Sequence, residues 1–346
     1  MPSLPPPVTL RDIAERVGLS RMSVSCALRH SPRVKKETAE RIRAVARELG
    51  YSPDPRMAGA MARVRETKFK TLEPVAWLNG NLNARAYSEY AWLAPYREGA
   101  AERCLELGYK LDDFWLREPG MTDRRMSSIL ANRGIRGVIV CPSVLPYVPR
   151  LRLDWRHFSS VSLETAVLAP RLHRVEADYY HNIQLALKVL RRVGYRRIGL
   201  FLQNQEQQRS HHKYIAGLLY FQSGIPTRER VPYCGYKLFE SGMLKAWLDR
   251  TRPDVVLAHH SKVLACVRDF GLRVPREIGI AHLSLDGDCE DWAGIWKHKR
   301  LIGAQAVEQL VSMMQNQRKG LPRVACETLV PGEWRHGKTL LPHVKK

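Results

Sequence analysis

The sequence predicts a small all-α helix-turn-helix headpiece followed by an α/β core made of two doubly wound parallel sheets. Within the first 53 residues, apolar side chains recur at the three- and four-residue spacing of one-sided helices. From Pro74 onward, short apolar runs alternate with amphipathic helical stretches, which is typical of parallel sheets covered by helices. We therefore divide the chain into a headpiece at 1–53, a short helix and basic linker at 54–71, and a core with two subdomains at 72–346.

The chain is strongly basic, with 56 Lys and Arg residues against 34 Asp and Glu, which gives a formal net charge of +22. Such a charge attracts polyanions, which release counterions when they are bound. Residues 1–70 contain 15 Lys and Arg against 7 Asp and Glu, so this segment is about twice as basic per residue as the rest. The composition therefore favours nucleic acid or an anionic surface as a partner.

Cysteine usage and the N-terminus indicate a cytoplasmic protein. The seven cysteines are scattered and form no Cys-Xaa-Xaa-Cys pair, so neither a disulfide framework nor a zinc site is expected. The first residues lack the charged start and apolar stretch of an export signal, and no run approaches the roughly 18 apolar residues of a membrane span. No membrane partner, cofactor or metal is expected.

Three helices are predicted in the headpiece. Residues 10–17 carry a one-sided apolar pattern, with Thr9 as the N-cap. The turn at 18–20 contains a glycine, and Ser20 is placed to cap a second helix that begins at the next residue. A third helix is predicted over about 37–49, followed by a glycine suited to its end.

The second helix has one apolar and one polar face. Val24, Ala27 and Leu28 share the face that would pack on the first helix. The opposite face is free to enter a groove and carries these side chains: Arg21, Met22, Ser25, Cys26 and Arg29. Spacing alone favours DNA binding, and a small helical bundle with a solvated charged face is the alternative.

The headpiece contains three informative strings: Val8-Thr9-Leu10-Arg11-Asp12-Ile13-Ala14, Gly18-Leu19-Ser20-Arg21-Met22-Ser23-Val24-Ser25 and Glu48-Leu49-Gly50-Tyr51-Ser52-Pro53. All three resemble the headpiece of the lactose-repressor (LacI/GalR) family. The resemblance implies that the second helix lies in the major groove, with base contacts from Arg21, Met22, Ser25 and Cys26. It implies phosphate contacts from Thr9, Ser20, Ser23 and Arg29. Cys26 departs from the family pattern, which usually has Arg there, so the base preference stays open.

The same resemblance gives a role to the short helix predicted after Asp54 and Pro55. In the family this hinge helix orders on operator DNA and inserts an apolar side chain into the minor groove. Ala60 stands where the family usually has Leu, and Met61 beside it is the candidate for that role. A plain linker helix is the alternative.

Five apolar runs in the core predict buried parallel strands, and amphipathic stretches predict helices between them. The runs are 75–78, 137–141, 197–202, 255–258 and 278–283, and the helices are 96–107, 178–193 and 303–317. Ligands of such sheets bind beyond the carboxyl ends of the strands. Polar candidates that follow these ends are Asn79, Ser143, Arg209, His259 and Asp286. They include no nucleophile with a base and an orienting group at recognisable spacing, which favours a binding cleft over an active site.

The core also resembles the family's periplasmic-binding-protein-like domain, in the stretches 190–199, 252–257, 271–279 and 302–307. This resemblance implies two subdomains joined by three crossovers, an effector bound between them, and homodimers formed side by side. Closure of the cleft would move the hinge helices and change the affinity for operator DNA.

Two departures from the family leave the effector open. Tyr214 stands where sugar-binding members have Arg, and Asp286 is displaced from the family's Asp position. Tyr236 and His259 align with pocket positions without naming a ligand. A sugar or related metabolite is one alternative, and a chain that senses something else or nothing is another.

Two further sequence patterns are typical of a nucleotide-binding site and of a metal site, but their surroundings along the chain argue against both functions. Residues 332–339 match the phosphate-loop pattern GxxxxGK[ST], but only seven residues follow Thr339, too few for the helix that such a site needs. The pairs at 211–212 and 259–260 are adjacent histidines with no carboxylate or cysteine partner at ligand spacing. Neither a nucleotide-binding enzyme nor a metal site is expected.

Together the observations predict a sequence-specific transcriptional regulator, a repressor, that binds a pseudo-palindromic DNA operator as a homodimer. A small-molecule effector bound between the subdomains would tune its operator affinity. The alternative from another class is a solute-binding protein without DNA specificity, which the basic headpiece argues against.

Overall fold

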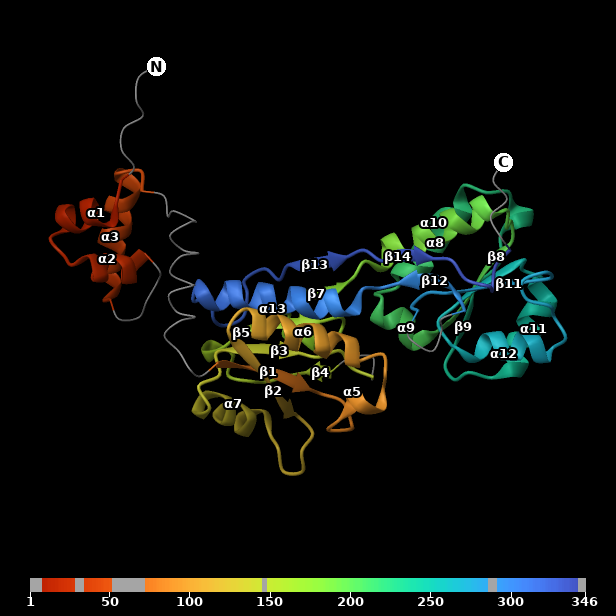
Figure 1. Ribbon diagram of the computed structural model, residues 1–346, viewed down its shortest axis with the longest axis horizontal. Helices are drawn as coiled ribbons and strands as arrows, with labels where there is room; N and C mark the ends of the chain where they lie inside the picture. Colours follow the sequence, from red (N-terminus) through yellow and green to blue (C-terminus); the bar gives the residue numbers. More distant parts are fainter. Residues whose placement is uncertain (1–7, 29–33, 52–71, 145–147, 286–290, 342–346) are drawn as a thin grey trace, which may run out of the picture.

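The computed structural model describes residues 8–28, 34–51, 72–144, 148–285 and 291–341 (Figure 1). Within these ranges no helix has both the length and the apolar character that a membrane crossing requires. The predicted hinge helix with Ala60 and Met61 lies outside the described residues, and so do the candidates Arg29 and Asp286.

The headpiece consists of three helices, as the sequence predicts: α1 (Leu10–Val17), α2 (Arg21–Leu28) and α3 (Lys36–Glu48). Thr9 caps α1 in a reciprocal capping box with Asp12, and Gly18 ends this helix at φ +68°, a left-handed conformation that glycine adopts without strain. The helices enclose a small core whose fully buried members are Ile13, Val24, Ala27 and Ile42. The inner face predicted for the second helix is therefore confirmed.

The first core sheet has six parallel strands in the order β13-β7-β5-β3-β1-β2. Their bounds are β1 (Glu73–Asn79), β2 (Tyr109–Trp115), β3 (Gly137–Val140), β5 (Ser159–Leu163), β7 (His173–Ala177) and β13 (Glu327–Val330). The associated helices are α5 (Ala86–Glu89), α6 (Ala94–Glu106), α7 (Asp123–Asn132) and α13 (Lys299–Gln315), and β4 (Val148–Arg150) and β6 (Val167–Ala169) form a separate small pair. We call this unit the N-terminal subdomain.

The second sheet also has six strands, in the order β14-β12-β11-β10-β8-β9, of which only β14 runs antiparallel to its neighbour. Their bounds are β8 (Ile198–Gln203), β9 (Cys234–Tyr236), β10 (Val255–Ala258), β11 (Gly279–His282), β12 (Ala293–Trp296) and β14 (Glu333–Arg335). Its helices are α8 (Tyr179–Val193), α9 (Asn204–Arg209), α10 (Lys213–Ser223), α11 (Ser241–Thr251) and α12 (Lys262–Asp269). We call this unit the C-terminal subdomain.

The chain passes between the two sheets three times: from β7 into α8, from β12 into α13, and from β13 into β14. Figure 1 shows these connections where the two subdomains meet, with α13 running along the N-terminal subdomain. Two doubly wound, mostly parallel sheets are thus confirmed as the fold of the core.

Two glycines allow α6 and α13 to cross closely. A Cβ atom at Gly303 would lie 2.0 Å from the carbonyl oxygen of Tyr96, and one at Gly99 would lie 2.0 Å from that of Arg300. Since both contacts are with backbone atoms, no side chain could rotate away to make room. This close packing holds α13, which follows the passage out of β12, against the N-terminal subdomain.

The phosphate-loop match at 332–339 forms β14 and a turn. Thr339 is buried, its Oγ1 accepts a hydrogen bond from the Ala293 amide at 3.0 Å, and its carbonyl accepts one from Ile280 at 3.0 Å. These bonds hold the C-terminal segment against the second sheet, which accounts for the motif structurally.

Candidate functional site

A cavity of about 460 Å³ lies at the junction of the two subdomains. It is lined by residues that follow the carboxyl ends of strands in both sheets, the place where doubly wound folds bind ligands. The lining residues are Tyr90, Trp92, Tyr96, Pro142, Ser143, Val144, Glu164, Thr165, Tyr179, Gln203, Gln205, Glu206, Arg209, His259, His260, Ser261, His282, Ser284, Lys297 and Lys299.

The structure brings Ser143, Arg209 and His259 together in this cavity, three of the effector candidates named from the sequence. Asn79 lies at the end of β1 but is buried behind the lining. Its amide nitrogen donates to the carbonyls of Asn83 and Ala84 at 2.8 and 3.0 Å, so it shapes a loop.

The two candidate tyrosines belong to the core. Tyr214 is fully buried, packs edge-on against Tyr179 and donates a long hydrogen bond of 3.4 Å to the Leu283 carbonyl. Tyr236 stacks on Phe201 with ring centroids 4.5 Å apart. Neither tyrosine lines the cavity.

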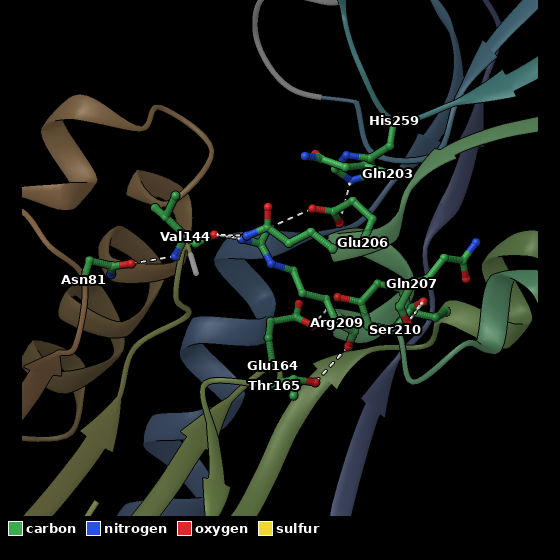
Figure 2. A network of polar contacts seen from close by, with 12 residues as sticks. Asn81, Val144, Glu164, Thr165, Gln203, Glu206, Gln207, Arg209, Ser210 and His259 are labelled. Carbon is green, nitrogen blue, oxygen red and sulfur yellow. Dashed lines mark hydrogen bonds and ion pairs between the residues drawn. The ribbon is translucent and has the colours of Figure 1, made fainter. Parts of the chain in front are cut away.

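Helix α9 bridges the cavity from the C-terminal subdomain (Figure 2). The side chains of Gln205 and Arg209 both donate hydrogen bonds to the carbonyl of Val144 in the N-terminal subdomain. The Val144 amide in turn donates to the side-chain oxygen of Asn81, which adds a contact that holds this residue. Thr165 adds a second bridge by donating to the Arg209 carbonyl at 2.8 Å.

Two buried carboxylates face the cavity, and both accept hydrogen bonds from the protein. Glu206 is 2.9 Å from the Arg209 guanidinium, and its second oxygen is 3.5 Å from Nε2 of His259. Glu164 accepts hydrogen bonds from the hydroxyls of Tyr96 and Tyr179, at 2.7 and 2.6 Å. The burial of these acids is thus compensated locally.

Cations are concentrated at the same place. Lys297 and Lys299, on the passage from β12 into α13, are only 4% and 7% exposed. Burial holds the pKa of His259 well below its ordinary value, and the positive charges of Lys297, Lys299 and Arg209 add to this shift, as does His282. His259 is therefore a neutral imidazole at pH 7 despite the nearby Glu206.

Most of the charged residues that line the cavity were not identified from the sequence. Glu164 follows β5 and Lys297 follows β12, and neither strand was recognised as an apolar run. β5 reads Ser-Ser-Val-Ser-Leu, yet all five residues are buried. A search for polar residues after short β-branched segments, including serine-rich ones, would have found Glu164 and Thr165.

In the headpiece, α2 carries four of the residues that the sequence assigns to its outer face. Arg21 is exposed at the start of the helix, and Ser25 and Cys26 are half-buried along it. Ser20 caps the helix through a 3.1 Å hydrogen bond from the Ser23 amide, and the two serine hydroxyls lie 2.9 Å apart. Met22 also lies on α2.

The described residues contain no cluster of three or more His, Cys, Asp or Glu side chains with the geometry of a metal site. The histidine pairs take part in other contacts. His211 lies between Thr165 and Arg174, with Nε2 at 3.0 and 2.8 Å from them. His260 stacks on Phe239, with ring centroids 4.5 Å apart.

Comparison with known proteins relates both parts of the chain to one group. Residues 9–54 match the family model described as bacterial regulatory proteins, lacI family. The chain is 24% identical to the HTH-type transcriptional repressor CytR of Escherichia coli (strain K12), with 94% of this chain and 96% of CytR covered. It is 25% identical to the HTH-type transcriptional repressor PurR of Pectobacterium carotovorum subsp. carotovorum (strain PC1), with 79% of each covered.

Solved structures share the fold at lower identity. The Lac repressor dimer bound to operator and the anti-inducer ONPF aligns with a TM-score of 0.55 at 19% identity, covering 97% of this chain and all of the other. The complex of the transcriptional regulator CelR with cellobiose aligns with a TM-score of 0.56 at 17% identity, covering 96% and 99%. The likeness spans headpiece and core together.

Proposed function

Because the chain is a member of the LacI family of bacterial regulatory proteins, we propose that it is a transcriptional repressor whose hold on operator DNA is tuned by a small molecule. The headpiece at 1–53 binds DNA, the segment at 54–71 is the hinge, and the core at 72–346 senses the effector and forms the homodimer. A DNA target requires the protein to act in the cytoplasm, as expected from its composition.

The observation that carries this proposal is the division of α2 into two faces. Val24 and Ala27 are fully buried against the other headpiece helices, whereas Arg21 at the start of the same helix is exposed. A short helix held by its inner face and preceded by a tight turn is the element that enters the major groove in helix-turn-helix proteins. The basic charge of the segment supplies the attraction to phosphate.

Individual contacts follow from this docking. Base edges are read by Arg21, Met22, Ser25 and Cys26, with Arg21 directed at guanine. Phosphates are bound by Thr9, Ser20, Ser23 and Arg29. Ala60 and Met61 of the hinge contact the minor groove of a pseudo-palindromic operator that matches the two-fold symmetry of the dimer.

The effector binds in the cavity at the subdomain junction, where Ser143, Arg209 and His259 meet. Two solved structures with the same fold support this role: CelR is in complex with cellobiose, and the Lac repressor dimer is bound to operator and the anti-inducer ONPF. Because α9 bridges the cavity through Arg209 and Val144, a ligand that enters it changes the contacts between the subdomains. Asn79, Tyr214 and Tyr236 then act behind the lining, and Asp286 remains a candidate.

The test is selection of binding sites from random duplex DNA by the purified full-length protein. We expect an inverted repeat, bound far more tightly than scrambled DNA, with an affinity that falls steeply with salt. Arg21→Ala should lose about 1 to 3 kcal/mol of discrimination at one base pair of each half-site, whereas Arg29→Ala should weaken binding to all sequences alike.

Arg124→Ala is the matched control, since it removes one exposed positive charge from α7 in the core. It should leave both affinity and specificity unchanged. Recovery of no motif, with equal affinity for every duplex, would instead favour a solute-binding protein without DNA specificity.

A further inference from the structure

The loops before the strands of the first sheet carry a group of exposed basic side chains. Because all six strands are parallel, these loops meet at one edge of the sheet, away from the junction cavity at the carboxyl ends (Figure 1). The exposed cations are Arg136, Arg156, Arg318, Lys319 and Arg323. We call these five residues the basic edge.

Hydrogen bonds join the three loops of the basic edge at Ser159, the first residue of β5. The Ser159 amide donates to the carbonyl of Arg136 at 2.8 Å, and its hydroxyl donates to the carbonyl of Arg318 at 2.8 Å. The amide of Gly320 donates to the carbonyl of Phe158 at 3.0 Å. The cations of the three loops therefore belong to one surface, although they are far apart in the sequence.

The basic edge keeps an excess of positive charge after its ion pairs are considered. Arg136 pairs with Glu73, and Arg156 pairs with Asp154. The side chains of the other three cations, on the segment between α13 and β13, form no ion pair with an acid in the ranges that the structure describes. Since exposed ion pairs contribute little free energy, the two paired arginines also remain available to an external anion.

The basic edge lies where the chain arrives from the headpiece. β1 begins at Glu73, the residue that pairs with Arg136, and residues 52–71 precede it. In the sequence this preceding segment contains five Lys and Arg residues against two Asp and Glu. It therefore adds positive charge beside the edge and connects the edge directly to the basic headpiece.

Duplex DNA has the charge that complements such a surface. It carries one phosphate charge about every 1.7 Å along its axis, and each phosphate that a Lys or Arg neutralises releases a bound counterion. At about 0.1 M salt, charges attract one another over roughly 10 Å, so direct contact with each phosphate is not required. A duplex held by the headpiece is the polyanion nearest to the basic edge along the chain.

We propose that the basic edge is a second DNA-binding surface, which binds phosphates of the duplex beside the operator while the headpiece binds the operator itself. The inference rests on the proposed function for the place of the protein on DNA, whereas the excess charge belongs to the core. Contacts to phosphates alone raise affinity without adding sequence specificity. The flanking DNA thus strengthens binding whatever its sequence.

The test compares two operator duplexes with the full-length protein. One duplex ends at the outer base pairs of the two half-sites, and the other extends about 15 base pairs, roughly one and a half helical turns, beyond each end. We expect the wild type to bind the extended duplex about tenfold more tightly at about 0.1 M salt. The slope of log affinity against log salt concentration should also be steeper for the extended duplex.

A triple variant removes the three unpaired charges of the edge: Arg318→Gln, Lys319→Gln and Arg323→Gln. All three side chains are exposed, so the variant should fold as the wild type does. On the extended duplex its salt slope should be smaller than that of the wild type by up to about 3, and most of the tenfold gain should disappear. On the short duplex its binding should be unchanged.

The matched control removes the same charge from the C-terminal subdomain, through Lys188→Gln, Arg192→Gln and Arg268→Gln. These residues are exposed on α8 and α12, and they are again one lysine and two arginines. If net charge alone mattered, the control would lose as much affinity as the triple variant of the edge. We expect it to bind both duplexes as the wild type does.

Two results would overturn the proposal. One is equal affinity of the wild type for the short and the extended duplex. The other is the same salt slope for both triple variants on the extended duplex, which would leave an acidic protein as the partner of the basic edge. If no operator is recovered, the proposed function fails separately. Random duplexes of the two lengths then take its place, and the edge variant should still show a smaller salt slope than the control on the extended one.

Discussion

Lys213 at the start of α10 places its Nζ atom 2.5 Å from Oε1 of Glu176 on β7, and this ion pair joins the two subdomains. Glu176 is completely buried, and its second oxygen is 3.4 Å from Nε of Arg174. Burial and the nearby Glu164 raise the pKa of Glu176, and Lys213 and Arg174 oppose this shift. The pair lies beside the passage from β7 into α8, so it stabilises the observed arrangement of the subdomains.

Replacing Lys213 with Met should lower the free energy of unfolding by about 2 to 3 kcal/mol. The substitution removes one of the two cations beside the buried carboxylate of Glu176. Because Arg174 remains close to the second oxygen, the loss of stability is at the lower end of the range for a broken buried ion pair. Urea unfolding at pH 7.5 measures the change. The double variant Lys213→Met with Glu176→Gln should recover part of the loss, because the uncompensated charge is removed.

The control for this pair is Lys245→Met. Lys245 forms a 2.9 Å ion pair with Asp249 on the surface of α11, where both side chains are more than half exposed. Its loss should cost less than about 0.5 kcal/mol. If Lys213→Met lowers the free energy of unfolding by no more than Lys245→Met does, the ion pair between Lys213 and Glu176 does not stabilise the arrangement of the subdomains.

A second prediction concerns the close crossing of α6 and α13. Gly303→Ala should destabilise the protein by about 3 kcal/mol, because the new Cβ would lie 2.0 Å from the Tyr96 carbonyl oxygen and the helices must move apart. Gly242→Ala is the matched control in α11, where a Cβ would meet no atom within 4 Å. It should be neutral or stabilising by up to about 1 kcal/mol, since alanine favours helix. Thermal unfolding measures the stability of both variants. Equal stabilities of Gly303→Ala and Gly242→Ala would contradict the close contact between α6 and α13.

The sequence predicted the strands that read as continuous apolar runs. β1, β3, β8, β10 and β11 lie within a residue or two of their expected bounds, because a parallel strand covered on both faces needs apolar side chains throughout. β5 escaped notice because Ser159, Ser160 and Ser162 interrupt its pattern, although all three are buried. The missed strands are those that deliver Glu164 and Lys297 to the cavity.

The candidate site was harder to predict than the fold, since spacing along the chain does not determine where a side chain points. Arg209 and His259 were found because they follow strand ends. Tyr214 and Tyr236 were expected in the pocket from their alignment with the family, yet Tyr236 packs on Phe201 and Tyr214 on Tyr179. Side-chain direction depends on the packing of each helix and strand, which only the structure supplies.

The third prediction separates two roles of Ser20. Ser20→Ala should destabilise α2 by about 1 kcal/mol, because the Ser23 amide loses its capping oxygen. Ser20→Asp keeps a capping oxygen and adds a negative charge. If Ser20 lies near phosphate, Ser20→Asp should weaken binding to operator and random DNA alike while the stability of the helix is kept.

Amide hydrogen exchange of α2 reports the helix, and titration with labelled duplexes reports DNA binding. Glu89→Gln serves as a charge-changing control in the core. Undiminished DNA affinity for Ser20→Asp would remove Ser20 from the phosphate contacts and leave it as a cap alone.

The last prediction uses the neutral His259. Its pKa is well below the ordinary value of 6.5 in the folded protein, because of burial and its cationic neighbours. In the unfolded chain the same imidazole takes up a proton near pH 6.5. Below that pH the unfolded state therefore binds more protons, and the stability that is present above pH 6.5 is lost as the pH falls toward the folded pKa.

His259→Gln should remove this contribution. Its unfolding free energy should fall less steeply below pH 6.5 than that of the wild type, by up to about 1.4 kcal/mol per pH unit. Other histidines with lowered pKa, His173, His211 and His260, keep some slope in both proteins, so the difference between them isolates His259. Parallel pH profiles for His259→Gln and the wild type would mean that the pKa of His259 is not lowered in the folded cavity, which would contradict this prediction.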